Sequence, residues 1–156
     1  PTLRHSSAAS DVYKRQGGPC SSWLGNAENQ NQVSGVIYEA PVISFWESVE
    51  INGESRFPWV PSSLFSYFKI FTEIRYGVDF DSMDFRYDLI DSQIPALLFH
   101  GDDDEWVPVS MSDFIASSRD YKYTYKRYEN VGHVTAWNAD PEDYQKTIKE
   151  FLNSLD

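Results

Sequence analysis

Short apolar runs alternate with amphipathic segments along most of this 156-residue chain. Residues 36–40 form an apolar run that ends at Pro41, and residues 96–100 form another that follows Pro95. Both have the length and composition of strands buried in a parallel sheet. Residues 121–128 contain four tyrosines and one threonine, which are β-formers, and predict a third strand at the edge side of that sheet. Strands that alternate with helices predict an α/β fold with a largely parallel sheet.

The clearest helix signal begins at Asp140. Asp140 is a good N-cap, Pro141 suits the first helical position, and acidic residues follow in the first turn. The apolar residues then recur at helical spacing and predict a helix that packs on the sheet: Tyr144, Ile148, Phe151, Leu152 and Leu155. Residues 110–119 predict another helix, between the second and third strands.

Residues 44–92 interrupt this alternation and contain 12 of the 25 aromatic residues of the chain. Such density predicts a cap or insertion over a pocket. Ser62 or Ser63 can cap a helix within it, and Gly77 can end that helix. Four aromatic residues of the segment can line an apolar pocket or pack the cap on its base: Phe45, Trp46, Phe57 and Trp59.

Residues 1–16 differ from the rest of the chain, since they hold three basic residues and one acid, Asp11. They show no apolar period and resemble a translated library adapter, so we exclude them from fold reasoning. An ordinary disordered tail is the alternative. The domain is expected to cover residues 17–156, with 44–92 as its cap.

Composition and charge exclude several classes of protein. Acidic residues outnumber basic ones 24 to 13, which argues against a nucleic-acid partner. No stretch in this segment approaches the roughly 18 apolar residues that a membrane span needs. Cys20 is the single cysteine, so an internal disulfide and a cysteine-based metal cluster are excluded, and a reducing compartment such as the cytoplasm is favoured.

Candidate catalytic residues follow two of the predicted strands. Asp104 lies four residues after the strand that closes at His100, and His133 lies just beyond the strand that ends near Tyr128. Catalytic groups of open α/β sheets collect beyond the carboxyl ends of the strands, so we expect these two side chains to meet. The acidic run 102–105 lacks the glycine and the alternating ligands of a calcium loop, and we expect no metal there.

Two motifs stand in a fixed order: His100-Gly101, Asp104 and Val107-Pro108, then Gly132-His133 before the terminal helix. From Gly17 to Asp156 the chain resembles the C-terminal part of a serine α/β-hydrolase, in the lysophospholipase and serine-aminopeptidase-like branch. Bacterial members have stretches similar to residues 133–141. The resemblance implies the C-terminal portion of an α/β-hydrolase fold, a small-molecule ester or amide substrate, and neither a cofactor nor a metal.

The resemblance also implies roles for the two candidates. Asp104 would be the acid of a catalytic triad and His133 its general base, in the chain order of these hydrolases. The sequence contains no Gly-x-Ser-x-Gly motif, and the family would place it just before a pair such as Gly17-Gly18. Ser21 and Ser22 fall in the following helix. We therefore expect a chain that lacks the nucleophile and the oxyanion hole and is inert alone.

Further residues remain open between substrate binding and packing. Trp106 and Trp137 flank the two catalytic candidates, and Trp46 stands in the cap, so each can contact substrate or belong to the core. His100 is expected to serve packing or local hydrogen bonding. Two alternatives keep the fold: an aspartate nucleophile, as in dehalogenases and epoxide hydrolases, or a noncatalytic binding protein. The residue at the absent nucleophile position distinguishes all three.

Overall fold

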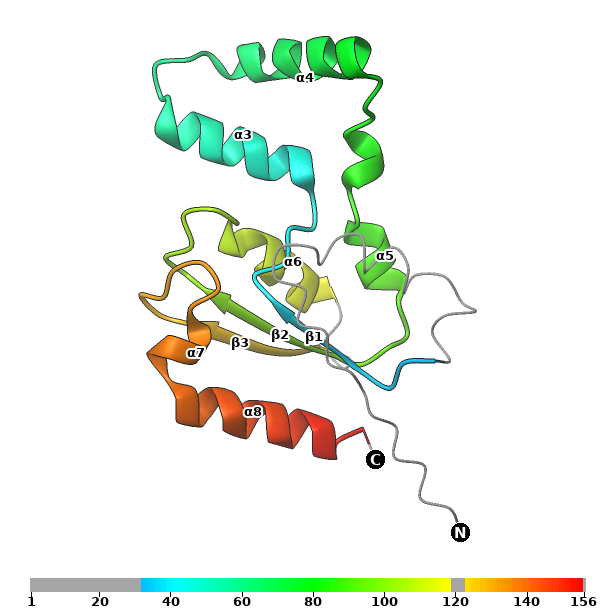
Figure 1. Ribbon diagram of the computed structural model, residues 1–156, viewed down its shortest axis with the longest axis vertical. Helices are drawn as coiled ribbons and strands as arrows, with labels where there is room; N and C mark the ends of the chain where they lie inside the picture. The colour runs from blue at the N-terminus through cyan, green and yellow to red at the C-terminus, as the bar shows by residue number, and fades with distance from the viewer. Residues whose placement is uncertain (1–31, 119–122, 156) are drawn as a thin grey trace.

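A computed structural model describes residues 32–118 and 123–155. Within them, strands β1 (Val36–Glu39), β2 (Ala96–Gly101) and β3 (Tyr123–Tyr128) form a parallel sheet in the order β1-β2-β3 (Figure 1). The predicted α/β class and parallel sheet are confirmed. The predictions for residues 1–16, Cys20, Ser21 and Ser22 lie outside the described residues.

Strand β2 is the centre of the sheet, and all six of its residues are buried. Strand β1 ends one residue earlier than the apolar run predicts. The reason is the backbone of Ala40, whose φ of 45° lies in the left-handed region and turns the chain just before Pro41. The amide of Ala40 still donates a hydrogen bond to the carbonyl of Phe99, so the turn stays attached to β2.

Helices cover both faces of the sheet. Successive residues of β2 point to opposite faces. On one face, Leu98 packs with residues of α5 (Arg86–Asp91) and α6 (Val109–Ser118), among them Leu89, Met111 and Ile115. On the other face, Phe99 packs with residues of α7 (Ala136–Ala139) and α8 (Pro141–Asn153), among them Ala136, Tyr144 and Phe151. Figure 1 shows the resulting three layers.

Helix α8 begins as the sequence predicts. The Asp140 carboxylate accepts a hydrogen bond of 2.9 Å from the backbone N–H of Asp143, and Pro141 takes the first helical position. The prediction that Leu152 packs on the sheet is wrong, because 50% of this residue is exposed. The row that faces the sheet is Tyr144, Ile148, Phe151 and Leu155, and Leu152 falls one helical row beside it.

The segment that leaves the sheet after β1 contains α3 (Phe45–Arg56), α4 (Ser62–Tyr76) and the short 3-10 helix η1 (Asp81–Met83). It returns beside its point of departure, because the amide of Phe85 donates to the carbonyl of Ile43 at 2.7 Å. Figure 1 shows α3 and α4 at the end of the molecule opposite α8. Gly77 ends α4 with a φ of 67°, as expected, whereas Pro61 and not a serine occupies the N-cap.

No helix in the described part of the chain is long and apolar enough to cross a membrane.

Candidate active site

Asp104 and His133 lie in contact at the carboxyl ends of β2 and β3. The distance from Asp104 Oδ2 to His133 Nδ1 is 2.8 Å. The Asp104 side chain has no exposed surface, and 11% of the His133 side chain is exposed. The fold thus brings together the two residues that the sequence singles out, with only the histidine open to solvent.

Backbone and side-chain donors surround the Asp104 carboxylate. Its Oδ1 accepts hydrogen bonds from the amides of Trp106, at 2.8 Å, and Val107, at 2.9 Å. Burial alone raises the pKa of Asp104, but hydrogen bonds from His100, Val107, His133 and Trp106 outweigh it and lower that pKa to about 2. The carboxylate is therefore ionised at neutral pH. His133 Nδ1 must carry the proton of the shared hydrogen bond, which leaves Nε2 with a free lone pair.

A second histidine supports the carboxylate from behind. His100 is fully buried, and its Nδ1 lies 2.6 Å from the hydroxyl of Ser112. Its Nε2 lies 3.1 Å from the Val107 carbonyl and 3.3 Å from Asp104 Oδ2. Both of those partners are acceptors, so Nε2 carries the proton and the Ser112 hydroxyl donates to Nδ1. His100 is thus a hydrogen-bonding support of Asp104 inside the core.

The loop after β2 and the loop after β3 are joined through their backbones. The amide of Asp103 donates to the carbonyl of Val131 at 3.1 Å, and the amide of Asp102 donates to the carbonyl of Tyr128 at 2.9 Å. A Cβ on Gly101 would lie 2.0 Å from the Val131 carbonyl oxygen. Only glycine allows this approach, which fixes the loop that carries His133 against the loop that carries Asp104.

The turn around His133 contains a strained residue. Val134 has a φ of 52°, a left-handed conformation that a β-branched residue rarely adopts. The hydroxyl of Thr135 donates to the carbonyl of Gly132 at 2.9 Å and closes the turn. Such strain persists only where the surroundings determine the backbone, and here it coincides with the candidate base.

A pocket of about 460 Å³ opens beside His133. One wall is a single face of α3, since the residues there recur at helical spacing: Phe45, Ser48, Val49, Asn52 and Arg56. Val42, Trp106 and Val107 complete the lining. The Asn52 side-chain amide donates to the Trp106 carbonyl at 2.7 Å and ties this wall to the Asp104 loop.

The three predicted tryptophans differ in position. Trp106 lines the pocket and is 59% exposed. Trp46 is buried in the segment that leaves the sheet after β1, where its ring lies 6.4 Å from Phe68 and 5.2 Å from Phe80. Trp137 stands edge-on to the ring of Tyr144 at 5.6 Å. Neither Trp46 nor Trp137 is among the residues that line this pocket.

The other aromatic residues singled out between positions 44 and 92 also differ in position. Phe45 lines the pocket, whereas Phe57 and Trp59 contact each other edge to face at 6.4 Å and do not line it. Sequence reasoning missed Asn52 and Arg56, because the apolar residues of α3 do not gather on one face. It also missed Ser112, which only the fold brings to His100.

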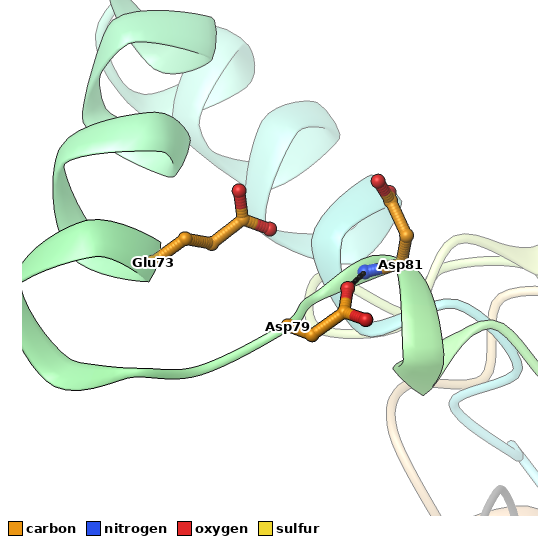
Figure 2. A group of neighbouring side chains, drawn as sticks. All are labelled: Glu73, Asp79 and Asp81. Atoms are coloured by element: carbon orange, nitrogen blue, oxygen red, sulfur yellow. Dashed lines mark hydrogen bonds between the residues drawn. The ribbon is translucent and has the colours of Figure 1, made fainter.

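Three carboxylates gather at the far end of α4 (Figure 2): Glu73, Asp79 and Asp81. Each has a structural partner. Lys69 forms an ion pair with Asp81 and lies 4.0 Å from Glu73. Asp79 accepts the backbone N–H of Asp81 at 3.0 Å, and Glu73 accepts that of Phe80 at 3.1 Å. These contacts hold the turn between α4 and η1, and we assign no metal to them.

Comparisons with known proteins indicate which fold this architecture belongs to. No protein-family model and no curated protein sequence matches the chain. Solved structures do match. An esterase of Pyrococcus furiosus has a TM-score of 0.58 and 17% identity, with 86% of this chain and 48% of the esterase covered. The chain has part of the α/β-hydrolase fold.

Two further structures support the same fold. A meta-cleavage product hydrolase of Pseudomonas fluorescens has a TM-score of 0.55 and 14% identity, covering 90% of this chain and 62% of that one. A bromoperoxidase of Bacillus anthracis has a TM-score of 0.56 and 15% identity, covering 90% and 65%. The chain spans about half the length of the Pyrococcus furiosus esterase.

Proposed function

We propose that this chain carries the acid and the base of a serine hydrolase that cleaves carboxylic esters, or amides, through an acyl-enzyme. The observation that supports it most is the 2.8 Å contact between the fully buried Asp104 carboxylate and His133 Nδ1. This contact fixes the tautomer of His133 and leaves Nε2 as the proton acceptor.

The proposed reaction uses a serine that is not among these residues. The sequence contains no Gly-x-Ser-x-Gly motif, so we propose that the nucleophile and the oxyanion hole belong to a segment that precedes this one. The serine hydroxyl passes its proton to His133 Nε2 as its oxygen bonds to the ester carbonyl carbon. The imidazolium then returns the proton to the leaving alcohol, and a water molecule releases the acid by the same route.

The pocket is the proposed substrate site. Val42, Phe45, Val49 and Val107 supply apolar surface, which suits an acyl chain or another apolar group. Residues 44–92 are the proposed cap, because α3 forms one wall of the pocket. We also propose membership of the lysophospholipase-like branch, on the motif around His100 and Asp104 alone.

The decisive experiment uses a longer copy of the gene that includes the preceding segment. His133→Ala should lower kcat for a p-nitrophenyl ester by about 10⁴-fold. Gln145→Ala replaces an exposed residue of α8 that does not line the pocket and should leave turnover unchanged. Esterase activity that survives His133→Ala overturns the assignment.

The same longer copy separates the alternatives. A serine between the elbow glycines supports the proposal, an aspartate indicates the dehalogenase and epoxide hydrolase chemistry, and any residue that cannot act as a nucleophile indicates a binding protein. The 156-residue chain itself should not turn over p-nitrophenyl esters. Turnover that disappears on mutation of Ser21 or Ser22 contradicts this expectation.

A further inference from the structure

The pocket lining includes a cationic side chain, Arg56, that the proposed chemistry does not use. We propose that Arg56 makes this site select substrates that carry an anionic group, a carboxylate or a phosphate, on an otherwise apolar body. The inference rests on the proposed function, because it takes the pocket as the substrate site.

The charge of the pocket lining is unusual for this chain. Acidic residues number 24 in the sequence, yet none of those in the described ranges lines the pocket. In the described part of the chain, Arg56 is the one permanently charged residue of the lining. An anion that enters this pocket therefore meets a positive lining, although the whole chain carries a formal charge of -11.

Among the described residues, Arg56 also lacks the carboxylate partner that Arg86 and Arg127 have. Arg86 pairs with Glu47 at 2.8 Å, and Arg127 pairs with Asp113 at 2.9 Å. Within residues 32–118 and 123–155, Arg56 forms no such ion pair. Its donors are thus available to a ligand.

The position of the guanidinium is fixed by an aromatic ring. Arg56 Cζ lies 4.8 Å from the centre of the Trp106 ring, a cation–π contact that leaves the planar N–H fork free for bidentate binding of a carboxylate or phosphate. Trp106 also donates its amide to Asp104. The cation and the candidate triad acid therefore belong to one connected wall.

The positions of the pocket-lining residues along α3 indicate the kind of ligand. Phe45 and Arg56 stand at opposite ends of the helix face that lines the pocket, about 16 Å apart along the axis at 1.5 Å per residue. Of the apolar lining residues, Phe45 and Val49 belong to the first half of this face, and Val42 precedes the helix. An amphiphile with an apolar chain and an anionic group matches that order.

A structural role is the alternative, since Arg56 stands in the last turn of α3, where a cation also interacts favourably with the helix dipole. The chain offers a matched control. Arg75 stands in the last turn of α4 and lies 5.3 Å over the ring of Tyr76, but it does not line the pocket. A difference between the effects of substituting Arg56 and Arg75 can therefore be attributed to the position of Arg56 in the pocket.

The experiment follows the indole N–H resonance of Trp106 in the ¹⁵N-labelled chain, assigned with Trp106→Phe. Octanoate, octyl phosphate and octanamide are titrated separately. At least one anion should bind about fivefold more tightly than octanamide, as expected for one partly solvated ionic contact. Arg56→Gln should remove this preference, Arg56→Lys should keep part of it, and Arg75→Gln should keep all of it.

The comparison of the two anions identifies whether carboxylate or phosphate is preferred. Equal binding of octanamide and both anions overturns the inference and leaves the hydrolase proposal intact. So does an equal loss of preference in Arg75→Gln, which would indicate a general effect of surface charge. Absence of any response at Trp106 also overturns the inference, whereas the hydrolase proposal stands or falls with His133→Ala in the longer copy.

Discussion

The sheet with its flanking helices and the α3–α4 segment bury their apolar residues to very different extents. Leu97, Phe99 and Ile115 are at most 1% exposed, whereas α4 has no buried residue. On α4, Ile74 is 80% exposed and Phe71 is 64% exposed. The described chain therefore buries the central strand β2 and the residues packed on it, but it does not cover the apolar side chains of α4.

The two regions also carry different parts of the proposed chemistry. The acid and base are held by backbone hydrogen bonds and by a buried histidine on the side of the core. The pocket wall that we propose to determine specificity stands on α3, which the Asn52 contact with Trp106 ties to the Asp104 loop. Loss of core packing should thus impair catalysis, and changes on the pocket face of α3 should alter selectivity with little effect on folding.

The largest predicted difference comes from matched isoleucines of the two regions. Ile115→Ala in α6 should lower the free energy of unfolding by about 3 kcal/mol, because it leaves a cavity in the core. Ile74→Ala in α4 should change it by less than about 0.5 kcal/mol, because this side chain is already in water. Urea unfolding of the two variants measures both. Equal effects would show that α4 is buried in solution.

Gly101→Ala should be the next largest effect. The new methyl group would meet the Val131 carbonyl and separate the loops that carry Asp104 and His133, at a cost of about 2 to 3 kcal/mol. Gly132→Ala is the control, since a Cβ there lies no closer than 3.8 Å to another residue. Urea unfolding again measures the difference, and an unaffected Gly101→Ala protein contradicts the proposed close approach.

The lowered pKa of Asp104 predicts a specific dependence of stability on pH. Its pKa in the folded chain, about 2, lies below the ordinary value of 3.8, so its contribution is full above about pH 4 and is lost as pH falls toward 2. The wild type should lose about 2 kcal/mol more than Asp104→Asn over this interval. Unfolding curves at a series of pH values test this. Parallel curves for both proteins contradict the hydrogen-bonded, ionised carboxylate.

Ser112→Ala should have the smallest effect of the four. Removal of the hydroxyl leaves Nδ1 of the buried His100 without its partner, at a cost of about 1 kcal/mol. The downfield proton resonance of His133 Nδ1–H should broaden as Asp104 loses its support. Ser117→Ala, which removes a hydrogen bond to the Phe114 carbonyl on the same helix, should leave that resonance unchanged. An unchanged resonance in Ser112→Ala contradicts the positioning role of His100.

Local patterns predict the sheet and the contact between Asp104 and His133 well. The apolar run 96–100 becomes a fully buried central strand, since few other environments accept such a run. Asp140 and Pro141 mark the start of α8, because capping depends on neighbouring residues only. Asp104 and His133 are predicted by their places after two parallel strands, whose carboxyl ends share one edge.

The sequence by itself thus determines the elements and the order in which the candidate acid and base follow them. The tertiary structure alone decides which residues meet those two side chains. Ser112 reaches His100, the backbone of Val131 approaches Gly101, and Arg56 comes to lie over Trp106. The physical reason is that each of these contacts joins residues separated along the chain by 12 to 50 positions. Packing between layers creates them, and no local pattern encodes it.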